Sequence, residues 1–327
     1  MVIPIKPEQV AGLFSEGIET VPATLSERRH RRDALLRESF AQRARRVGAS
    51  LAYAAAPNRL RGLAAGLDFL ARERSIAPAN LPSPEHSLAY PAGLCGLAAV
   101  LSPAAVMDGY SRGLLLFAPV GPAAWWSPSQ RSVAVPGSIG RGAFVPCPLE
   151  LQGLRATMDR AFEEVLAVCS RPDRAGRRLG FGPKLTRAYA ELHEAGFAHS
   201  FEIGYRDGEP LAGGFGISVG RTFVTTACFG PVELAASGLV VLDRHLAEWG
   251  YATHEARLGT TPGARLPEKA RRLGFMPMAR QEFVARLKAN LCGGRLSRWR
   301  IDPLLCRDPA PERLAAASDH APLASAA

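Results

Sequence analysis

The sequence predicts an α/β protein of α+β character, in which a hairpin of two strands leads into alternating helices and strands. Its central stretch runs from 181 to 229, where a helical pattern over 183–196 precedes two β-rich runs around Asp207-Gly208, a strong hairpin signal. A strand over 222–228, a helix over 232–249 and a strand over 251–258 then alternate, which is typical of α/β architecture. With 327 residues, the chain can hold a substantial core and one or two domains.

Each of these elements has its own local signal. Apolar residues recur at helical spacing over 183–196, with a proline suited to the first turn and a glycine suited to the stop. Gly213 and Gly214 lie inside the second strand of the hairpin, so we expect a bulge or a close backbone approach there. A helix over 158–169, a short helix over 267–273 and a strand over 276–283 complete the pattern.

The central stretch resembles the leucyl/phenylalanyl-tRNA–protein transferases. That family carries A-Y-x-x-L-H-x-x-G-x-A-H-S-x-E and then a glycine-rich strand. Here these read Ala188-Tyr189, Leu192-His193, Gly196, Ala198-His199-Ser200 and Glu202, followed by Gly213-Gly214-Phe215-Gly216. Further matches are Gly96-Leu97-Ala98-Ala99, Leu101-Ser102, Tyr110, Gly113, Trp125-Trp126-Ser127-Pro128-Ser129-Gln130-Arg131 and Leu273-Gly274-Phe275. The resemblance implies a larger domain with the fold of the Gcn5-related N-acetyltransferases, and transfer of leucine or phenylalanine from tRNA to a peptide amine without a cofactor.

We expect four regions along the chain. Residues 1–85 read as a basic helical extension, 86–150 as a small N-terminal domain with the W-W-S-P motif, 151–290 as the acetyltransferase-like catalytic domain, and 291–327 as a basic and then disordered tail. In the extension, Ser26 is suited to cap a helix that ends at Gly48. Its apolar stripe would be Leu36, Phe40, Ala44 and Val47, with arginines on the other face, either along a phosphate backbone or simply in solvent.

The charge of the chain favours an anionic partner. A formal net charge of +10 indicates nucleic acid first and a membrane surface second, although a basic soluble protein without such a partner has the same composition. Ten cationic and only two acidic side chains lie between 265 and 300. The predicted tRNA contacts are Arg131, Arg280, Arg286, Lys288, Arg295, Arg298 and Arg300. Arg131 is also placed to pair with a carboxylate instead of a phosphate.

Cysteine usage and hydropathy suggest the compartment. The six cysteines are scattered without a C-x-x-C pair, which indicates reduced thiols in a cytoplasm and argues against a zinc site. Neither a secretory segment nor a transmembrane segment is evident. We therefore expect a cytoplasmic monomer with no metal, no cofactor and no membrane partner.

The family associates its chemistry with an E-S-M-F-S strand and a D-x-Q strand. These correspond here to Thr226-Ala227-Cys228-Phe229-Gly230 and to Glu255-Ala256-Arg257. The resemblance makes Glu255 and Arg257 the catalytic candidates, and residues 255 and 257 point to the same side of a strand, so Arg257 would neutralise Glu255. A purely structural ion pair is the alternative. We expect His193 and His199 to be hydrogen-bonded structural residues and not bases.

The substrate contacts are expected around the same strands. Phe215, Cys228 and Phe229 would line an apolar pocket for the amino acid, next to Thr226. Trp125 and Trp126 are adjacent and cannot share one face of a strand, so one is suited to stack on a terminal base while the other packs the domains, or both pack.

Two differences from the family's strands, at Thr226 and Arg257, affect the expected acceptor. The family's usual acceptors begin with Arg or Lys. The loss of an acid at Thr226 and the gain of a cation at Arg257 predict a neutral or acidic amine, either a peptide or a small molecule.

Two other functions fit parts of the pattern. An acyl-CoA-dependent N-acetyltransferase would use the same fold, but its pyrophosphate loop is absent at the expected place. A catalytically inactive relative that only binds tRNA would explain the altered strands.

Overall fold

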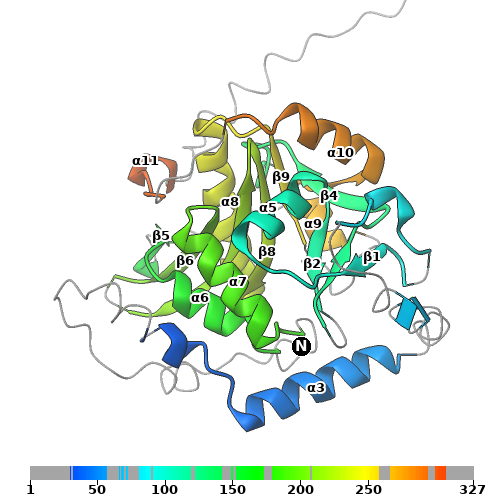
Figure 1. The fold of residues 1–327 in the computed structure, drawn as a ribbon. Helices are drawn as coiled ribbons and strands as arrows, with labels where there is room; N and C mark the ends of the chain where they lie inside the picture. Colours follow the sequence, from blue (N-terminus) through cyan, green and yellow to red (C-terminus); the bar gives the residue numbers. More distant parts are fainter. Residues whose placement is uncertain are drawn as a thin grey trace, which may run out of the picture.

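The structure is a computed structural model. It describes residues 30, 32–56, 66, 68–69, 71–72, 81–89, 91–118, 122–141, 149, 152–172, 179–206, 208–257, 266–293 and 299–306. These residues form the mixed α/β structure that the sequence predicts (Figure 1). Among them, no helix combines the length and the apolar character needed to cross a membrane.

The larger sheet has seven strands in the order β10-β4-β9-β8-β7-β6-β5. Neighbouring strands are antiparallel except for β8 and β9, which are parallel. The strands are β4 (Gln130–Ala134), β5 (Leu154–Met158), β6 (Ala198–Tyr205), β7 (Pro210–Val219), β8 (Thr222–Phe229), β9 (Thr253–Ala256) and β10 (Met276–Ala279). The pairing of β6 with β7 confirms the hairpin predicted from the sequence.

A smaller sheet of three strands lies beside the larger one. It has the order β1-β3-β2, with β1 (Leu94–Leu97), β2 (Leu115–Phe117) and β3 (Ala124–Trp126). Strand β4 follows directly in the chain but pairs with β9 and β10 of the larger sheet. The region predicted as a small domain over 86–150 therefore contributes a strand to both sheets.

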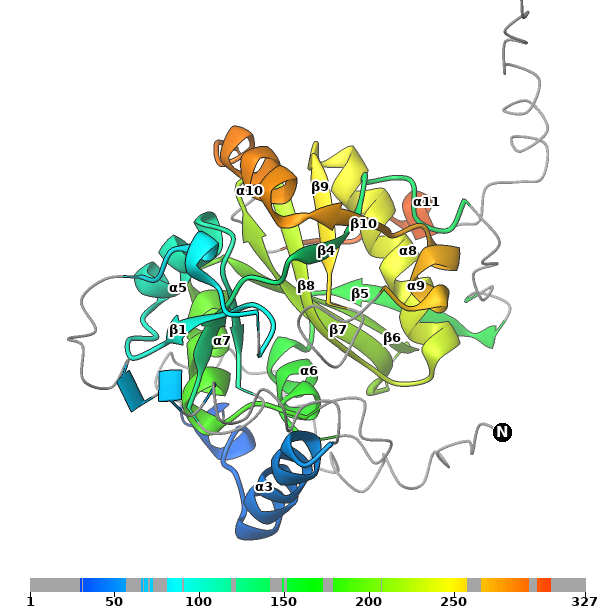
Figure 2. The same ribbon diagram turned by 90° about the vertical axis from the view of Figure 1, so that its right-hand side faces the viewer.

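Helices cover both faces of the larger sheet (Figures 1 and 2). On one face α8 (Val232–Glu248) packs against β6, β7 and β8. On the other face lie α6 (Phe162–Cys169) and α7 (Pro183–Glu194), with α5 (Pro103–Ser111) beside them. Because strand side chains alternate between faces, two separate hydrophobic cores form, one under α8 and one under α6 and α7. Other helices with described bounds are the 3₁₀-helix η1 (Pro84–His86), α3 (Phe40–Ala54), α9 (Glu268–Leu273), α10 (Arg280–Ala289) and α11 (Pro303–Cys306).

The glycines of β7 permit close strand contact, as the sequence predicts. A Cβ atom on Gly213 would lie 2.2 Å from the Phe201 carbonyl oxygen, and one on Gly214 would lie 2.4 Å from the Ala227 carbonyl oxygen. Gly213 and Gly214 pair regularly with β8, and a bulge occurs instead one residue beyond them, on β8. The register shifts after Phe215, so that Thr226 becomes the extra residue on β8.

The H-S-x-E part of the central motif forms a buried hydrogen-bond network. The Asp159 carboxylate accepts from His199 Nδ1 at 2.8 Å, from the Ser200 amide at 2.9 Å and from the Trp299 amide at 2.9 Å. Ser200 Oγ donates to Glu202 Oε1 at 2.6 Å. The pKa of Asp159 is lowered in the fold. Burial alone would raise this pKa, but the hydrogen bond and charge of His199 and the two amide donors together outweigh burial. The network joins β5, β6 and the C-terminal segment.

The two motif histidines are structural, as expected. His193 Nδ1 lies 2.8 Å from the Ala198 carbonyl, and its ring stacks on Phe162 with 3.9 Å between centroids. His199 is 1% exposed, and its ring stacks on Trp299 at 4.1 Å. Burial lowers the pKa of His193, so the neutral ring is favoured in the fold.

Two segments differ from the prediction, one expected as a strand and one expected as a helix with other bounds. The strand expected over 276–283 ends at Ala279, and α10 begins at Arg280, so that Phe283 packs as a helical core residue. In the extension, α3 begins after Ser39, which caps it, and runs through Gly48 to Ala54. A glycine within a helix costs only about 1 kcal/mol, which the local capping box helps to offset. Ser26 lies outside the described residues.

Most of the apolar stripe predicted in the extension, namely Phe40, Ala44 and Val47, is exposed. Phe40 is 88% exposed and Val47 is 43% exposed. Of that stripe, Leu36 packs against the core under α7, and Arg32 forms an ion pair with Glu194. Ala49 and Tyr53 of α3 pack against the cluster that contains Phe117 and Trp126.

Candidate active site

The carboxyl ends of β8 and β9 lie where the two sheets meet. Pairing between them extends to Thr225 and Ala256, and the Arg257 amide then donates to the Thr225 carbonyl at 3.0 Å. Within the described residues, β8 continues to Phe229 without a β9 partner. Strand β2 of the smaller sheet approaches here, because Arg257 Nη1 donates to the Leu116 carbonyl at 2.9 Å. The carboxyl ends of adjacent parallel strands are common ligand sites in α/β sheets.

Four polar side chains from separate elements gather at this point. Tyr110 comes from α5, Tyr189 from α7, Thr226 from the bulge on β8, and Arg257 from the residue after β9. The two tyrosine hydroxyl oxygens are 3.5 Å apart, and Tyr110 also interacts with the Thr226 side chain. The Arg257 guanidinium carbon lies 4.8 Å from the centre of the Phe117 ring. We call these four side chains the polar cluster.

Both tyrosine hydroxyls of the polar cluster are neutral at ordinary pH. Burial raises the pKa of Tyr110, and the nearby charge of Arg257 only partly opposes this. Burial, with the neighbouring Tyr110, raises the pKa of Tyr189 well above its usual value. The tyrosines can therefore donate hydrogen bonds to a developing negative charge, but they cannot act as bases.

Glu255 is paired with Arg131 and not with Arg257, which corrects the expectation from the sequence. Arg131 Nε donates to one Glu255 oxygen, and Arg131 Nη2 donates to the other at 2.7 Å. The Arg131 and Glu255 side chains are 1% and 3% exposed. Arg131 Nη1 also donates to the Gly113 carbonyl at 2.8 Å, which ties β4 and β9 to the turn before β2. Thus Arg131 takes the carboxylate-pairing alternative and is not placed to meet tRNA phosphate.

The residues predicted to form the aminoacyl pocket lie on two faces of the sheet. Phe215 and Phe229 belong to the core under α6 and α7, where the Phe215 ring is 5.1 Å from Tyr189 and 6.0 Å from Phe181. Cys228 packs against the opposite core, under α8. A strand turns successive side chains to opposite faces, so Cys228 cannot line one pocket with Phe215 and Phe229. Phe181 lies beside Phe215 in the same core, and we call Phe181, Phe215 and Phe229 the aromatic group.

The adjacent tryptophans are both buried and point in opposite directions. Trp125 is 1% exposed and packs in the core with α5, close to Gly109. Trp126 is 6% exposed, and its ring lies edge-on to Phe117 with 5.8 Å between centroids. Its indole Nε1 donates to the Phe117 carbonyl at 3.2 Å. The alternative in which both tryptophans pack is the one that this geometry supports.

A hydroxyl–imidazole–carboxylate chain lies on the α8 side of the same strands. Thr225 Oγ1 is 2.9 Å from His254 Nε2, and His254 Nδ1 is 3.1 Å from Asp243 Oδ1. The other Asp243 oxygen accepts from the Gly137 and Ile139 amides at 2.7 and 3.0 Å. His254 and Asp243 are fully buried and Thr225 is 1% exposed, so these hydrogen bonds brace β8 and β9.

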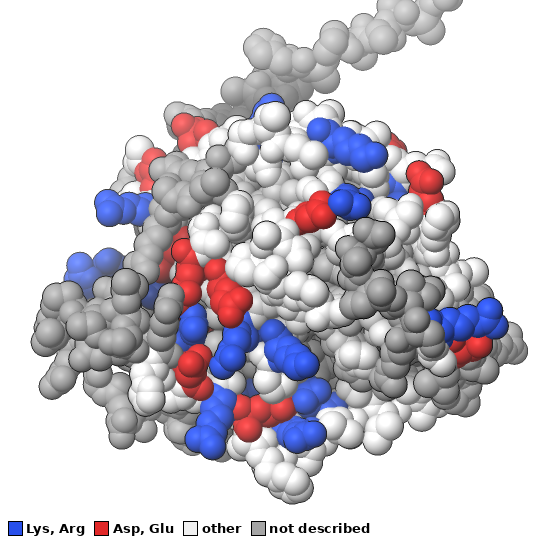
Figure 3. All heavy atoms as spheres, viewed as in Figure 1, with Lys and Arg blue, Asp and Glu red and all other residues white. Residues whose placement is uncertain are grey.

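The predicted tRNA-binding residues lie in different settings. Arg286 and Lys288 are in the last turn of α10, with Lys288 exposed and the Arg286 side chain 37% exposed. Arg300 is exposed, whereas Arg295 and Arg298 lie outside the described residues. Arg280 is partly buried, donating to Ser87 and to the Ser127 carbonyl. Figure 3 shows basic side chains over α10 and, mixed with acids, over α3 and α7.

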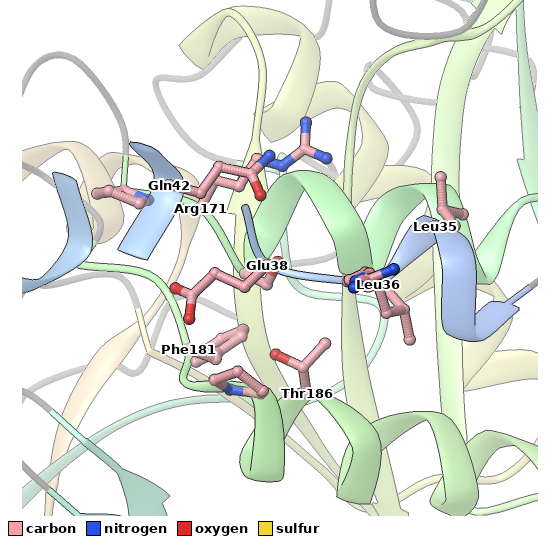
Figure 4. Close-up of a pocket in the computed structure, with 11 residues that line it drawn as sticks. Leu35, Leu36, Glu38, Gln42, Arg171, Phe181 and Thr186 are labelled. Carbon is pink, nitrogen blue, oxygen red and sulfur yellow. The ribbon is translucent and has the colours of Figure 1, made fainter. Parts of the chain in front are cut away.

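A shallow pocket separates the extension from the body (Figure 4). Glu38 and Gln42 line it on the side of the extension, and Arg171, Phe181 and Thr186 line it on the other side. Phe181 is shared with the aromatic group, since its ring also lies 5.4 Å from that of Tyr189. Through Phe181, the described part of the extension therefore reaches the aromatic group.

Of the site residues, sequence reasoning missed the two tyrosines. Tyr110 and Tyr189 stand in the matched motifs, but the sequence alone assigns them no role in the site. Their motif membership was the available signal. His254 and Asp243 offered none, because isolated polar residues in a strand and a helix do not reveal that they meet.

The chain is similar to proteins of one family. A family model described as leucyl/phenylalanyl-tRNA protein transferase matches residues 148–288. Curated relatives named leucyl/phenylalanyl-tRNA–protein transferase include that of Thiobacillus denitrificans, 32% identical over 208 residues, or 63% of this chain and 88% of the relative. The transferase of Aeromonas hydrophila is 34% identical over 168 residues, which is 51% of this chain and 71% of the relative. The transferase of Chromohalobacter salexigens is 36% identical over 194 residues, which is 56% of this chain and 75% of the relative.

Proposed function

Because the chain belongs to the leucyl/phenylalanyl-tRNA–protein transferase family, we propose that it is an aminoacyltransferase that moves an apolar amino acid from tRNA to the amine of an acceptor such as a protein N-terminus. The observation that carries the proposal is the polar cluster at the carboxyl ends of β8 and β9, next to a buried aromatic group. It offers hydrogen-bond donors beside an apolar surface, which is what transfer of a leucine or phenylalanine ester requires.

The reaction needs little chemical help from side chains. The acceptor nitrogen attacks the ester carbonyl carbon, a carbon–nitrogen bond forms, and the bond to the ribose oxygen breaks. The proton lost by the amine ends on that oxygen. Since the ester is already activated, positioning accounts for much of the rate. The neutral hydroxyls of Tyr110 and Tyr189 and the guanidinium of Arg257 can stabilise the negative charge that develops on the carbonyl oxygen.

Within this proposal, Glu255 is a positioning residue. Both of its carboxylate oxygens accept hydrogen bonds from Arg131, so neither is available to remove a proton from the acceptor amine. The pair instead fixes β9 against β4, and with it the place of Arg257. Thr226 and Arg257 are the members of the altered family strands that lie in the polar cluster.

The aromatic group supplies the amino-acid specificity that we propose. Phe181, Phe215 and Phe229 lie on the same face as the tyrosines and are each less than a tenth exposed. We propose that the amino-acid side chain binds against these rings, which would favour leucine or phenylalanine, because one buried methylene group contributes about 0.8 kcal/mol. The Trp126 ring packs edge-on against Phe117, whose ring in turn contacts the Arg257 guanidinium.

We propose that tRNA lies along the end of α10 and the segment that follows it. Changing Arg286 and Lys288 together to Glu is expected to weaken tRNA binding and to flatten its dependence on salt. Each lost phosphate contact removes about 0.7 to 0.9 from the slope of log affinity against log salt. The measurement is a binding titration at several salt concentrations.

A matched control is Arg271→Glu with Arg272→Glu, which makes the same change of charge on α9, at the other end of β10 (Figure 2). This control should keep a steep salt slope. Equal losses in both double variants would show that the overall charge, and not the end of α10, attracts tRNA.

The finer assignments belong to the same proposal. We assign residues 151–290 to an acetyltransferase-like domain, supported by a mixed sheet with one parallel pair followed by a long helix on one face. Aminoacyl-tRNA is a cytoplasmic substrate, so the proposed reaction belongs to the cytoplasm. A single copy of the chain holds all four members of the polar cluster, which is compatible with a monomeric enzyme.

A further inference from the structure

The polar cluster carries a net positive charge. Tyr110, Tyr189 and Thr226 are uncharged at ordinary pH. The carboxylate nearest in sequence, Glu255, is already compensated by Arg131. Among the described residues no carboxylate forms an ion pair with Arg257, which contacts a carbonyl and an aromatic ring instead. Its charge is therefore the one that a bound molecule would meet.

The Arg257 guanidinium is also held in a fixed place. Its Nη1 donates to the Leu116 carbonyl at 2.9 Å, and its plane lies near the Phe117 ring. The side chain is only partly buried, so part of it is within reach of a ligand. A guanidinium has five N–H donors in a planar fork that matches a carboxylate, and one held in advance loses less entropy when that carboxylate binds.

From this charge and geometry we infer that Arg257 selects an acceptor amine whose own residue carries a carboxylate, that is, a peptide beginning with aspartate or glutamate. The inference rests on the proposed function, because it names the acceptor of that reaction. A peptide that begins with arginine or lysine would bring a second cation to the polar cluster and would be repelled. In a partly solvated site one such charge contact changes the rate ratio by about tenfold or more.

The experiment measures transfer from leucyl-tRNA to matched peptides that differ only at the first residue, which is Asp, Asn, Ala or Arg. The unmodified protein should give the highest kcat/KM with Asp, about tenfold above Asn and further above Arg. Asparagine is the matched control, because it has the shape of aspartate without its charge.

The variants Arg257→Gln and Arg257→Lys identify the source of the preference. In Arg257→Gln, the kcat/KM of the Asp peptide should come close to that of the Asn peptide, and the kcat/KM of the Arg peptide should rise relative to that of the Ala peptide. Arg257→Lys should keep part of the preference for Asp. Arg272→Gln, on an exposed residue of α9, should change neither ratio. These ratios compare peptides within one variant, so a general loss of rate does not affect them.

Three results would overturn the inference. If the unmodified protein prefers the Arg peptide, or treats Asp and Asn alike, Arg257 does not select the acceptor, although the aminoacyltransferase function stands. If Arg257→Gln lowers tRNA affinity and leaves all peptide ratios unchanged, the guanidinium binds a tRNA phosphate instead. If no peptide receives leucine, the proposed function fails and this inference fails with it.

Discussion

Replacing Arg131 with Met is expected to lower the free energy of unfolding by about 3 to 5 kcal/mol. The change leaves the Glu255 carboxylate, whose side chain is 3% exposed, without the two donors that compensate its charge. It also removes the hydrogen bond to the Gly113 carbonyl and the contact with the Phe283 ring, whose centre lies 4.2 Å from the guanidinium carbon. Chemical denaturation followed by circular dichroism measures the loss.

The double variant Arg131→Met with Glu255→Leu is the matched control. It removes both charges and keeps most of the volume, so it should recover much of the lost stability, as buried ion pairs replaced by apolar groups often do. A single variant as stable as the unmodified protein would show that water reaches Glu255, against the burial described above.

Replacing Asp159 with Ala is expected to lower the free energy of unfolding by a similar amount, about 3 to 5 kcal/mol. Three donors, on His199, Ser200 and Trp299, would lose their acceptor, and each buried unpaired donor costs about 1 to 3 kcal/mol. Asp159 also has a φ of 51°, a left-handed conformation that Asp and Asn tolerate better than Ala.

Asp159→Asn separates these effects, because it keeps the conformational tolerance and one acceptor oxygen. It should lose clearly less stability than Asp159→Ala. The pKa of Asp159 is lowered in the fold, so the carboxylate's contribution is complete above the ordinary pKa of an aspartate and is lost as the pH falls through the lowered value. Stability measured against pH should therefore fall less steeply in acid for Asp159→Ala. Parallel curves for this variant and the unmodified protein would contradict the role given to Asp159.

Local patterns predicted much of the larger sheet. The helix before Ala198, the hairpin of β6 and β7, and the close approach at Gly213 follow from spacing and turn chemistry within a few residues. The extension shows the limit of such patterns. Phe40 and Val47 have the spacing of a buried stripe, yet both are exposed, whereas Leu36 of the same stripe packs against the core.

The site depended on contacts that no local pattern contains. Glu255 and Arg257 share one side of a strand, which favours a pair between them. Arg131, from a strand far away in the sequence, provides a better donor set for Glu255 because β4 lies directly beside β9. Tyr110 and Tyr189 meet because α5 and α7 cover the same face, which depends on the arrangement of both sheets.

The most direct test of the account is a single-turnover reaction between excess protein, radiolabelled leucyl-tRNA and a mixture of peptides with different first residues. We predict that label leaves the tRNA and appears as leucine joined to a peptide N-terminus, and that acetyl-CoA in place of leucyl-tRNA modifies no peptide. Binding of the tRNA without any transfer, or acetylation of the peptides from acetyl-CoA, would contradict the account.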